Sequence, residues 1–152
     1  MPAWETLVAF YGAALLLSLS PGPDNLFVLV QSVQRGWRVG LFARREDRLR
    51  ALVGELGADH ALSLPGDVTQ LADQQAALKR MTDAFGPLHA AFANAGGGLD
   101  AAGTEGGDVD EWQDMIRINI LGLLFTAKAA LPFLKETQGH LLMTGSAAGR
   151  IH

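Results

Sequence analysis

Four groups of residues that could bind or transform a small molecule each follow a short apolar run in this 152-residue sequence. Paired guanidinium groups can hold an anion through several hydrogen bonds, and a carboxylate can accept hydrogen bonds from a ligand. A small residue beside a glycine leaves room for a ligand near the backbone, and a serine hydroxyl can hydrogen-bond a carbonyl or an alcohol. The four groups are Arg44 and Arg45; Asp67 and Val68; Asn94, Ala95 and Gly96; and Ser146.

The elements that must position these groups alternate between helical and strand periodicity from Glu46 onward, which predicts an α/β domain. Apolar residues at helical spacing predict helices over 49–56 and 71–85, and a third helix begins at a predicted N-cap, Asp108. Pro132 is expected to kink or end this third helix. Apolar runs predict strands over 61–68, 88–92 and 140–144, and helical connections of this length imply parallel pairing.

Ligands bind such sheets outside the carboxyl ends of the strands, so we expect the four groups to meet at one edge. Each group also has a structural interpretation, and the residues alone leave the choice open. The arginines could be a solvated helix start, Asp67 a turn cap and Ser146 an ordinary loop residue. Asn119 lies among apolar residues of the third helix and could be a buried structural amide.

The composition favours a small-molecule partner and argues against nucleic acid. The chain has 12 Lys and Arg against 16 Asp and Glu, a formal net charge of −4, and no long basic run. It has no cysteine, which excludes disulfides and thiolate metal sites and fits a reducing, cytoplasmic compartment. The four histidines show no metal-ligand spacing, so no metal site is predicted.

Several motifs occur in the order and spacing of one enzyme family. They are ARREDRL after the second strand, GDVT after the third, NAG after the fourth, WQDMIRINILG in the long helix and GHLLMTGSAAGR around the fifth. Through these motifs, residues 43–150 resemble the short-chain dehydrogenase/reductase family. The resemblance implies an α/β fold with a partial Rossmann-like parallel sheet and flanking helices. The long apolar run before these motifs adds an expected apolar helical amino-terminal segment.

The resemblance also implies a role for each group. Arg44 and Arg45 would bind a 2′-phosphate on the cofactor's adenosine, which favours NADP over NAD. Asp67 would accept a hydrogen bond from the adenine amino group while Val68 packs beside the ring. The residues that let the backbone approach the cofactor ribose would be Asn94, Ala95 and Gly96.

Two catalytic residues follow from the same resemblance. Ser146 would hydrogen-bond the carbonyl or alcohol of a small-molecule substrate, and Asn119 would hold a water in a proton relay. The family's tyrosine and lysine, which follow this serine on the next helix, have no counterpart, because the only tyrosine is Tyr11. The glycine-rich turn that binds the cofactor pyrophosphate also has no match before Arg44. Activity is therefore expected to be absent or very weak.

The amino-terminal residues resemble a different family. Residues 21–41, PGPDNLFVLVQSVQRGWRVGL, are similar to the first segment of LysE-type amino-acid exporters, whose opening transmembrane helix carries a Pro-Gly-Pro-Asp-Asn motif. The apolar run 7–33 is long enough to cross roughly 30 Å of hydrocarbon, which permits membrane association through residues 4–33. The other interpretation is an apolar helix pair packed on the domain. Residues 26–30 are not expected to form the sheet's first strand, because too few residues follow for a parallel crossover.

The sequence therefore predicts an exporter-like segment over residues 1–41 joined to an incomplete dehydrogenase-like domain over 42–152. The leading hypothesis is an oxidoreductase module with little or no activity as it stands. The alternatives are a membrane-associated exporter remnant and a non-functional hybrid whose incomplete sheet exposes strand edges. Oligomer formation stays open.

Overall fold

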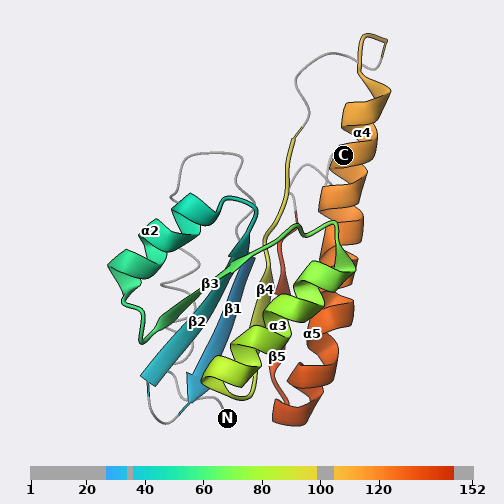
Figure 1. Cartoon of the computed structure of the whole chain (residues 1–152). Coiled ribbons are helices and arrows are strands. Elements are labelled where there is room, and N and C mark those ends of the chain that lie inside the picture. The colour runs from blue at the N-terminus through green and yellow to red at the C-terminus, as the bar shows by residue number, and fades with distance from the viewer. Residues whose placement is uncertain (1–26, 34–35, 99–104, 146–152) are drawn as a thin grey trace.

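The computed structural model describes residues 27–33, 36–98 and 105–145 (Figure 1). The exporter-like Pro-Gly-Pro-Asp-Asn motif at 21–25 and the serine at 146 lie outside the described residues. Membrane association through the amino-terminal segment and a domain division at residue 42 therefore stay predictions.

Five strands form one sheet in the order β3-β2-β1-β4-β5 (Figure 1). Strand β2 (Gly36–Ala43) pairs parallel with β3 (Ala61–Pro65), and β4 (Ala90–Ala93) pairs parallel with β5 (His140–Met143). The central strand β1 (Phe27–Val33) runs antiparallel to both of its neighbours, β2 and β4. The predicted α/β class is confirmed, and the predicted parallel pairing holds for the two outer pairs of strands.

The prediction that residues 26–30 cannot provide the central strand is wrong, because residues 27–33 occupy that position. Only a parallel strand at this position needs a long crossover. The two residues between Val33 and Gly36 are enough for an antiparallel hairpin. The same finding corrects the expected helical amino-terminal segment, since its residues 27–33 form a strand.

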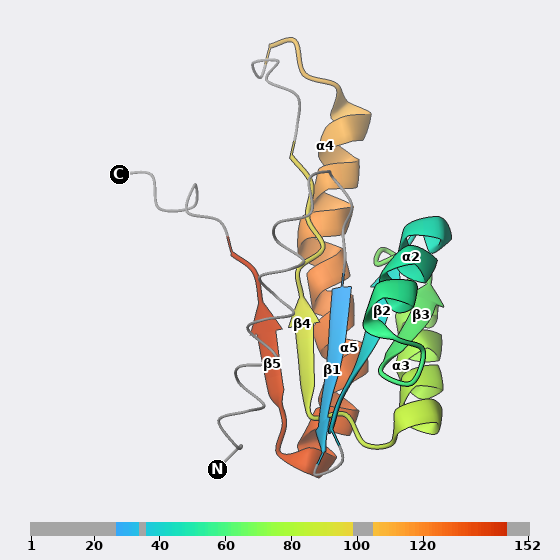
Figure 2. The same cartoon turned by 90° about the vertical axis from the view of Figure 1, so that its left-hand side faces the viewer.

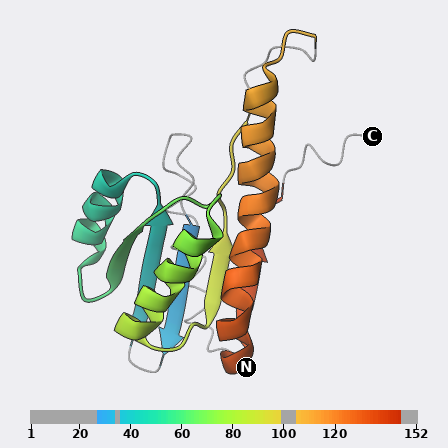
Figure 3. The same cartoon turned by 45° about the vertical axis from the view of Figure 1, so that its right-hand side comes forward.

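Helices cover both faces of the sheet (Figures 2 and 3). Helix α2 (Glu46–Leu56) lies over β2 and β3 on one face. Helix α3 (Leu71–Phe85) and helix α5 (Leu123–Thr137) lie side by side on the other face. Helix α5 continues α4 (Val109–Ile116) through a π-helical turn, η1 (Arg117–Gly122), and α4 extends beyond the end of the sheet (Figure 3).

The alternation of side chains along each strand builds a core on both faces of the sheet. Phe42 and Leu64 pack with Leu78 of α3, whereas the neighbouring Leu41 packs with Leu49 of α2. All five side chains are buried. Burying a side chain of this size contributes roughly 1.5–3 kcal/mol to folding, so these contacts fix α2 and α3 on opposite faces.

Most predicted helix boundaries are confirmed. Helices α2 and α3 end at Gly57 and Gly86, whose φ angles of 90° and 89° favour glycine. Asp108 caps α4, because its side chain accepts a hydrogen bond from the Asp110 N–H at 2.8 Å. The helix does not end at Pro132, however, but continues to Thr137.

The continuous helix Val109–Thr137 is, within the described part of the chain, long and apolar enough to cross a membrane. A core helix of a soluble protein meets the same criterion. This helix buries Ala129, Ala130 and Leu134 in the core beneath the sheet. Its length and composition are therefore weak support for a membrane span.

Candidate functional site

The carboxyl ends of four strands meet at one edge of the sheet. Ala43 at the end of β2 lies opposite Pro65 of β3, and Ala93 of β4 lies opposite Met143 of β5. Because β2 and β4 are both antiparallel to β1, they point in the same direction as each other. The predicted site residues that the structure describes at the ends of these strands are Arg44, Arg45, Asp67, Val68, Asn94, Ala95 and Gly96.

Arg44 and Arg45 lie between the end of β2 and the first turn of α2, and both side chains are exposed. The amino terminus of α2 adds partial positive charge from its peptide dipoles. Glu46 in the first turn is paired with Arg50, whose Nη2 lies 2.8 Å from Glu46 Oε1, so its negative charge is partly offset. Two guanidinium groups beside a helix amino terminus form a surface that suits a phosphate.

The half-buried Asp67 side chain holds its own loop. Its Oδ1 accepts hydrogen bonds from the N–H and the hydroxyl of Thr69, each at 2.9 Å. The Asp67 N–H donates to Asp73 Oδ2 at 3.0 Å. These bonds confirm the turn-cap interpretation of Asp67. Both side-chain bonds use Oδ1, so Oδ2 is the oxygen that could accept a hydrogen bond from a ligand.

Val68 is buried against the π turn of the long helix. A Cβ atom on Gly122 would lie 3.2 Å from Val68 Cγ2 and 3.4 Å from the Val68 carbonyl oxygen. The absence of a side chain at Gly122 therefore lets the loop after β3 approach the helix backbone.

Sequence reasoning missed a buried polar pair next to this contact. Gln74 of α3 and Thr126 of α5 are each 2% exposed, and Thr126 Oγ1 donates to Gln74 Oε1 at 2.7 Å. The sequence does contain a sign of this pair, because Gln74 lies on the apolar stripe of α3 together with Leu78 and Met81. A polar residue on such a stripe indicates a buried hydrogen-bond network.

The loop after β4 is joined to the end of β5. Thr144 Oγ1 donates to Asn94 Oδ1 at 2.7 Å, and the Thr144 N–H donates to the Ala93 carbonyl at 3.0 Å. Ala95 packs against the core, whereas Gly96 is exposed. Asn94 therefore fixes the start of this loop, and the two small residues that follow leave space beside it.

Asn119 lies in the π turn η1 and holds the same loop further along. Its Oδ1 accepts a hydrogen bond from the Gly97 N–H, and its Nδ2 donates to the Gly97 carbonyl, both at 2.8 Å. π turns inside α-helices frequently occur at functional sites. Both polar side-chain atoms bind Gly97, which agrees with a structural role, but the amide is half-buried and not buried as that interpretation had it. Its contact with a relay water stays a prediction.

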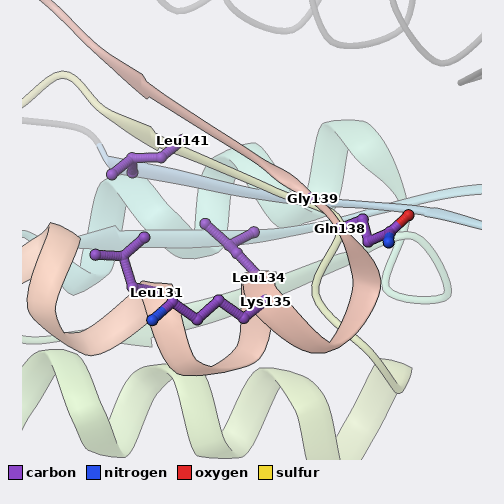
Figure 4. Close-up of a pocket in the computed structure, with 6 residues that line it drawn as sticks. All are labelled: Leu131, Leu134, Lys135, Gln138, Gly139 and Leu141. Carbon is purple, nitrogen blue, oxygen red and sulfur yellow. The ribbon is translucent and has the colours of Figure 1, made fainter.

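A shallow hollow of about 350 Å³ lies at the opposite end of the sheet from these residues. Figure 4 shows the residues that line it, Leu131, Leu134, Lys135, Gln138, Gly139 and Leu141. They belong to the carboxyl end of α5, the connection at 138–139 and the beginning of β5. The hollow is therefore separate from the candidate site. Among the described residues, no group of three or more His, Asp or Glu side chains could hold a metal ion.

Comparison with known proteins gives the family. Residues 28–152 match the family described as short chain dehydrogenase. The chain belongs to the short-chain dehydrogenase family. The match includes residues 28–41, which the sequence alone assigned to the exporter-like segment.

Individual relatives agree with this family assignment. An uncharacterized oxidoreductase of Staphylococcus aureus is 37% identical over 76% of this chain and 50% of its own length. An alcohol dehydrogenase of Thermococcus sibiricus, solved with 5-hydroxy-NADP, is 32% identical with a TM-score of 0.67, over 74% of this chain and 49% of its own. A 3-ketoacyl-ACP reductase of Sinorhizobium meliloti is 26% identical with a TM-score of 0.68, over 73% and 45%. This chain thus spans about half the length of these relatives.

The centre of the site edge departs from the short-chain dehydrogenase pattern that the sequence motifs imply. In that pattern the first strand runs toward this edge and continues into a glycine-rich turn and a helix. Here β1 begins at the edge, because Phe27 lies opposite Phe42, and runs away from it. Only two residues then connect β1 to β2, so neither the turn nor the helix has a place between these strands.

Proposed function

We propose that this chain is the nucleotide-binding part of a short-chain dehydrogenase-type oxidoreductase that prefers NADP over NAD. The observation that carries the proposal is the edge where Arg44, Arg45, and the loops after β3 and β4 come together. The similarity to the Thermococcus alcohol dehydrogenase solved with 5-hydroxy-NADP supports the choice of cofactor. The substrate class would be a small-molecule carbonyl or alcohol, in the cytoplasm.

The residues present fit the adenosine half of such a cofactor. Arg44 and Arg45 would bind the 2′-phosphate, helped by the amino terminus of α2. Asp67 Oδ2 would accept a hydrogen bond from the adenine amino group, beside the backbone of Val68. Asn94, Ala95 and Gly96 would lie along the ribose.

The proposal also covers the part of the site where the substrate would react. NADPH, when bound, supplies the hydride in this family. Ser146 would hydrogen-bond the substrate oxygen, and Asn119 would keep the loop at Gly97 in place beside it. Turnover would be weak, because the direction of β1 leaves the usual pyrophosphate-binding turn without a place in the sheet.

Nucleotide titration tests the proposal directly. NADPH binding, followed by nucleotide fluorescence or calorimetry, should be saturable, and NADH, which lacks the 2′-phosphate, should bind more weakly. Adenosine 2′,5′-bisphosphate, which keeps the adenosine and its 2′-phosphate together with a 5′-phosphate and lacks the nicotinamide half, should compete with NADPH. The absence of binding at millimolar concentrations of all three ligands would reject the proposed function.

A further inference from the structure

The Gln74 side chain makes three buried hydrogen bonds at the back of the loop after β3. Its Nε2 donates to the Val68 carbonyl at 2.7 Å and to the Gly122 carbonyl at 3.1 Å, and its Oε1 accepts from the Thr126 hydroxyl at 2.7 Å. Carbonyl oxygens only accept hydrogen bonds, so the amide nitrogen must face Val68 and Gly122. The orientation of the Gln74 amide is therefore fixed by its surroundings.

This network joins two parts of the chain that are far apart in sequence, residues 68–74 and residues 122–126. Gln74 lies 48 residues from Gly122 and 52 from Thr126. Gly122 closes the π turn η1, and the same turn carries Asn119, whose amide binds the Gly97 peptide. Two side-chain amides thus attach the loops after β3 and β4 to one turn of the long helix.

An apolar side chain would be the ordinary choice at the position of Gln74. Its neighbours Ala77, Leu78 and Met81 on α3 are buried in the apolar core. A buried amide loses its hydrogen bonds to water and must replace them with hydrogen bonds to the protein. What the amide adds is a defined position for the Val68 carbonyl, which an apolar side chain cannot hold.

We propose that Gln74 is a positioning residue, which fixes the Val68 carbonyl and thereby presets the loop of Asp67, Val68 and Thr69 for the adenine ring. The inference rests on the proposed function, because it concerns the same adenosine site. Gln74 lies behind the loop and acts through Val68. Its effect is to reduce the reorganisation that nucleotide binding requires.

The first test is the affinity for adenosine 2′,5′-bisphosphate, measured by calorimetry well below the unfolding temperature. Gln74→Met keeps the length of the side chain and removes the amide, and should raise Kd about tenfold. Thr137→Val is the matched control, because the Thr137 hydroxyl donates to the Leu88 carbonyl at 2.6 Å at the other end of the sheet. This control should lose stability with Kd unchanged. Equal effects of the two variants on Kd would overturn the inference.

Substitutions at Thr126 give a conservative rescue. Thr126→Ser keeps the hydroxyl, which lies 2.7 Å from Gln74 Oε1 and 3.0 Å from the Gly122 carbonyl, and should leave Kd within about twofold of the original value. Thr126→Val removes the hydroxyl and should weaken binding in the same direction as Gln74→Met. A Thr126→Ser variant that binds as poorly as Thr126→Val would contradict the role of this hydroxyl in holding the amide in place.

Amide hydrogen exchange separates failure of this inference from failure of the proposed function. Without nucleotide, Gln74→Met should speed exchange at the Thr69 and Gln70 amides about tenfold more than at Leu64 in β3. A uniform increase at all three positions would show a merely structural role and overturn the inference, even if nucleotide binds. If the unmodified chain binds no nucleotide, the proposed function fails, and the exchange ratio still decides whether Gln74 positions the loop.

Discussion

Replacing Gly122 with alanine tests the close approach between the long helix and the loop after β3. The new Cβ atom would meet Val68 Cγ2 at 3.2 Å and both Val68 Cβ and the Val68 carbonyl oxygen at 3.4 Å. Val68 is only 4% exposed, and its carbonyl is held by Gln74, so it has little freedom to move. The variant therefore forces a buried loop residue to shift by a few tenths of an ångström.

Two opposing terms set the size of the effect. Alanine is favoured over glycine in a helix by about 1 kcal/mol, whereas adding a methyl group to a packed interior typically costs about 1–3 kcal/mol. The net change in the free energy of unfolding should thus lie between about zero and a loss of 2 kcal/mol. Gly54 in α2 is the matched control, because a Cβ there would have no atom within 4 Å. Gly54→Ala should raise the free energy of unfolding by about 0.8–1 kcal/mol, because alanine is favoured over glycine in a helix.

Urea denaturation followed by circular dichroism measures both variants against the unmodified chain. The midpoint should rise for Gly54→Ala and stay level or fall for Gly122→Ala, with the same slope for all three proteins. The free energies of unfolding of the two variants should differ by about 1–3 kcal/mol. If Gly122→Ala is stabilised as much as Gly54→Ala, Val68 does not pack on the helix as described.

Three further substitutions address the site and its supports. Arg44→Ala should weaken NADPH binding about five- to tenfold, with a smaller effect at high salt. The control Lys79→Ala on α3 should leave the affinity unchanged, and calorimetry at two salt concentrations measures both variants. Asn119→Leu removes both bonds to Gly97 and should lower the free energy of unfolding by about 1–3 kcal/mol, and amide exchange at Gly97 that does not accelerate would contradict the pairing. Asp108→Ala should lose about 1 kcal/mol of stability in urea denaturation because the N-cap is removed, whereas Asp108→Asn retains most of it; equal losses would exclude the capping role.

The outer strands and the helices that follow them could be predicted from local patterns. Helical spacing of Leu49, Leu52 and Leu56 before Gly57 predicts α2, and that of Leu78 and neighbouring apolar residues predicts α3. Each of these helices buries one apolar stripe, so the spacing of its apolar residues is enough to predict the helix. The order of polar groups after the strands also placed the candidate site at one edge.

The direction of β1 could not be predicted in the same way. Residues 27–30 form a short apolar run, and the pattern of such a run does not distinguish a strand from a helix. Residues 34–35 carry no glycine that would indicate a tight hairpin. Whether the strand runs parallel or antiparallel depends on its pairing with β4, which lies far along the chain. Pairing between strands so far apart in sequence produces no recognisable pattern in the residues of β1 itself.

The buried network was missed for a related reason. The position of Gln74 on an apolar stripe is a local sign of a buried amide, but its partners Gly122 and Thr126 lie 48 and 52 residues further along the chain. The π turn around Asn119 likewise depends on contacts with the loop after β4. Pro132 was expected to kink or end the helix, yet α5 continues because its buried residues, such as Ala130 and Leu134, hold it on the sheet.

The direction of β1 is the claim on which the account of the site depends most. In antiparallel pairing, alternate opposed Cα atoms lie about 4.5 Å apart, which gives strong nuclear Overhauser effects between their Hα protons. NMR spectroscopy of the isotope-labelled chain should therefore show Hα–Hα contacts at alternate pairs, in opposite phase on the two sides of β1. They occur either at Val28–Leu41 and Val30–Val39 together with Leu29–Ala91, or at Leu29–Gly40 together with Val28–Phe92 and Val30–Ala90. A parallel pattern, without Hα–Hα contacts between β1 and either neighbour, would contradict the reversed central strand and the weak turnover that we infer from it.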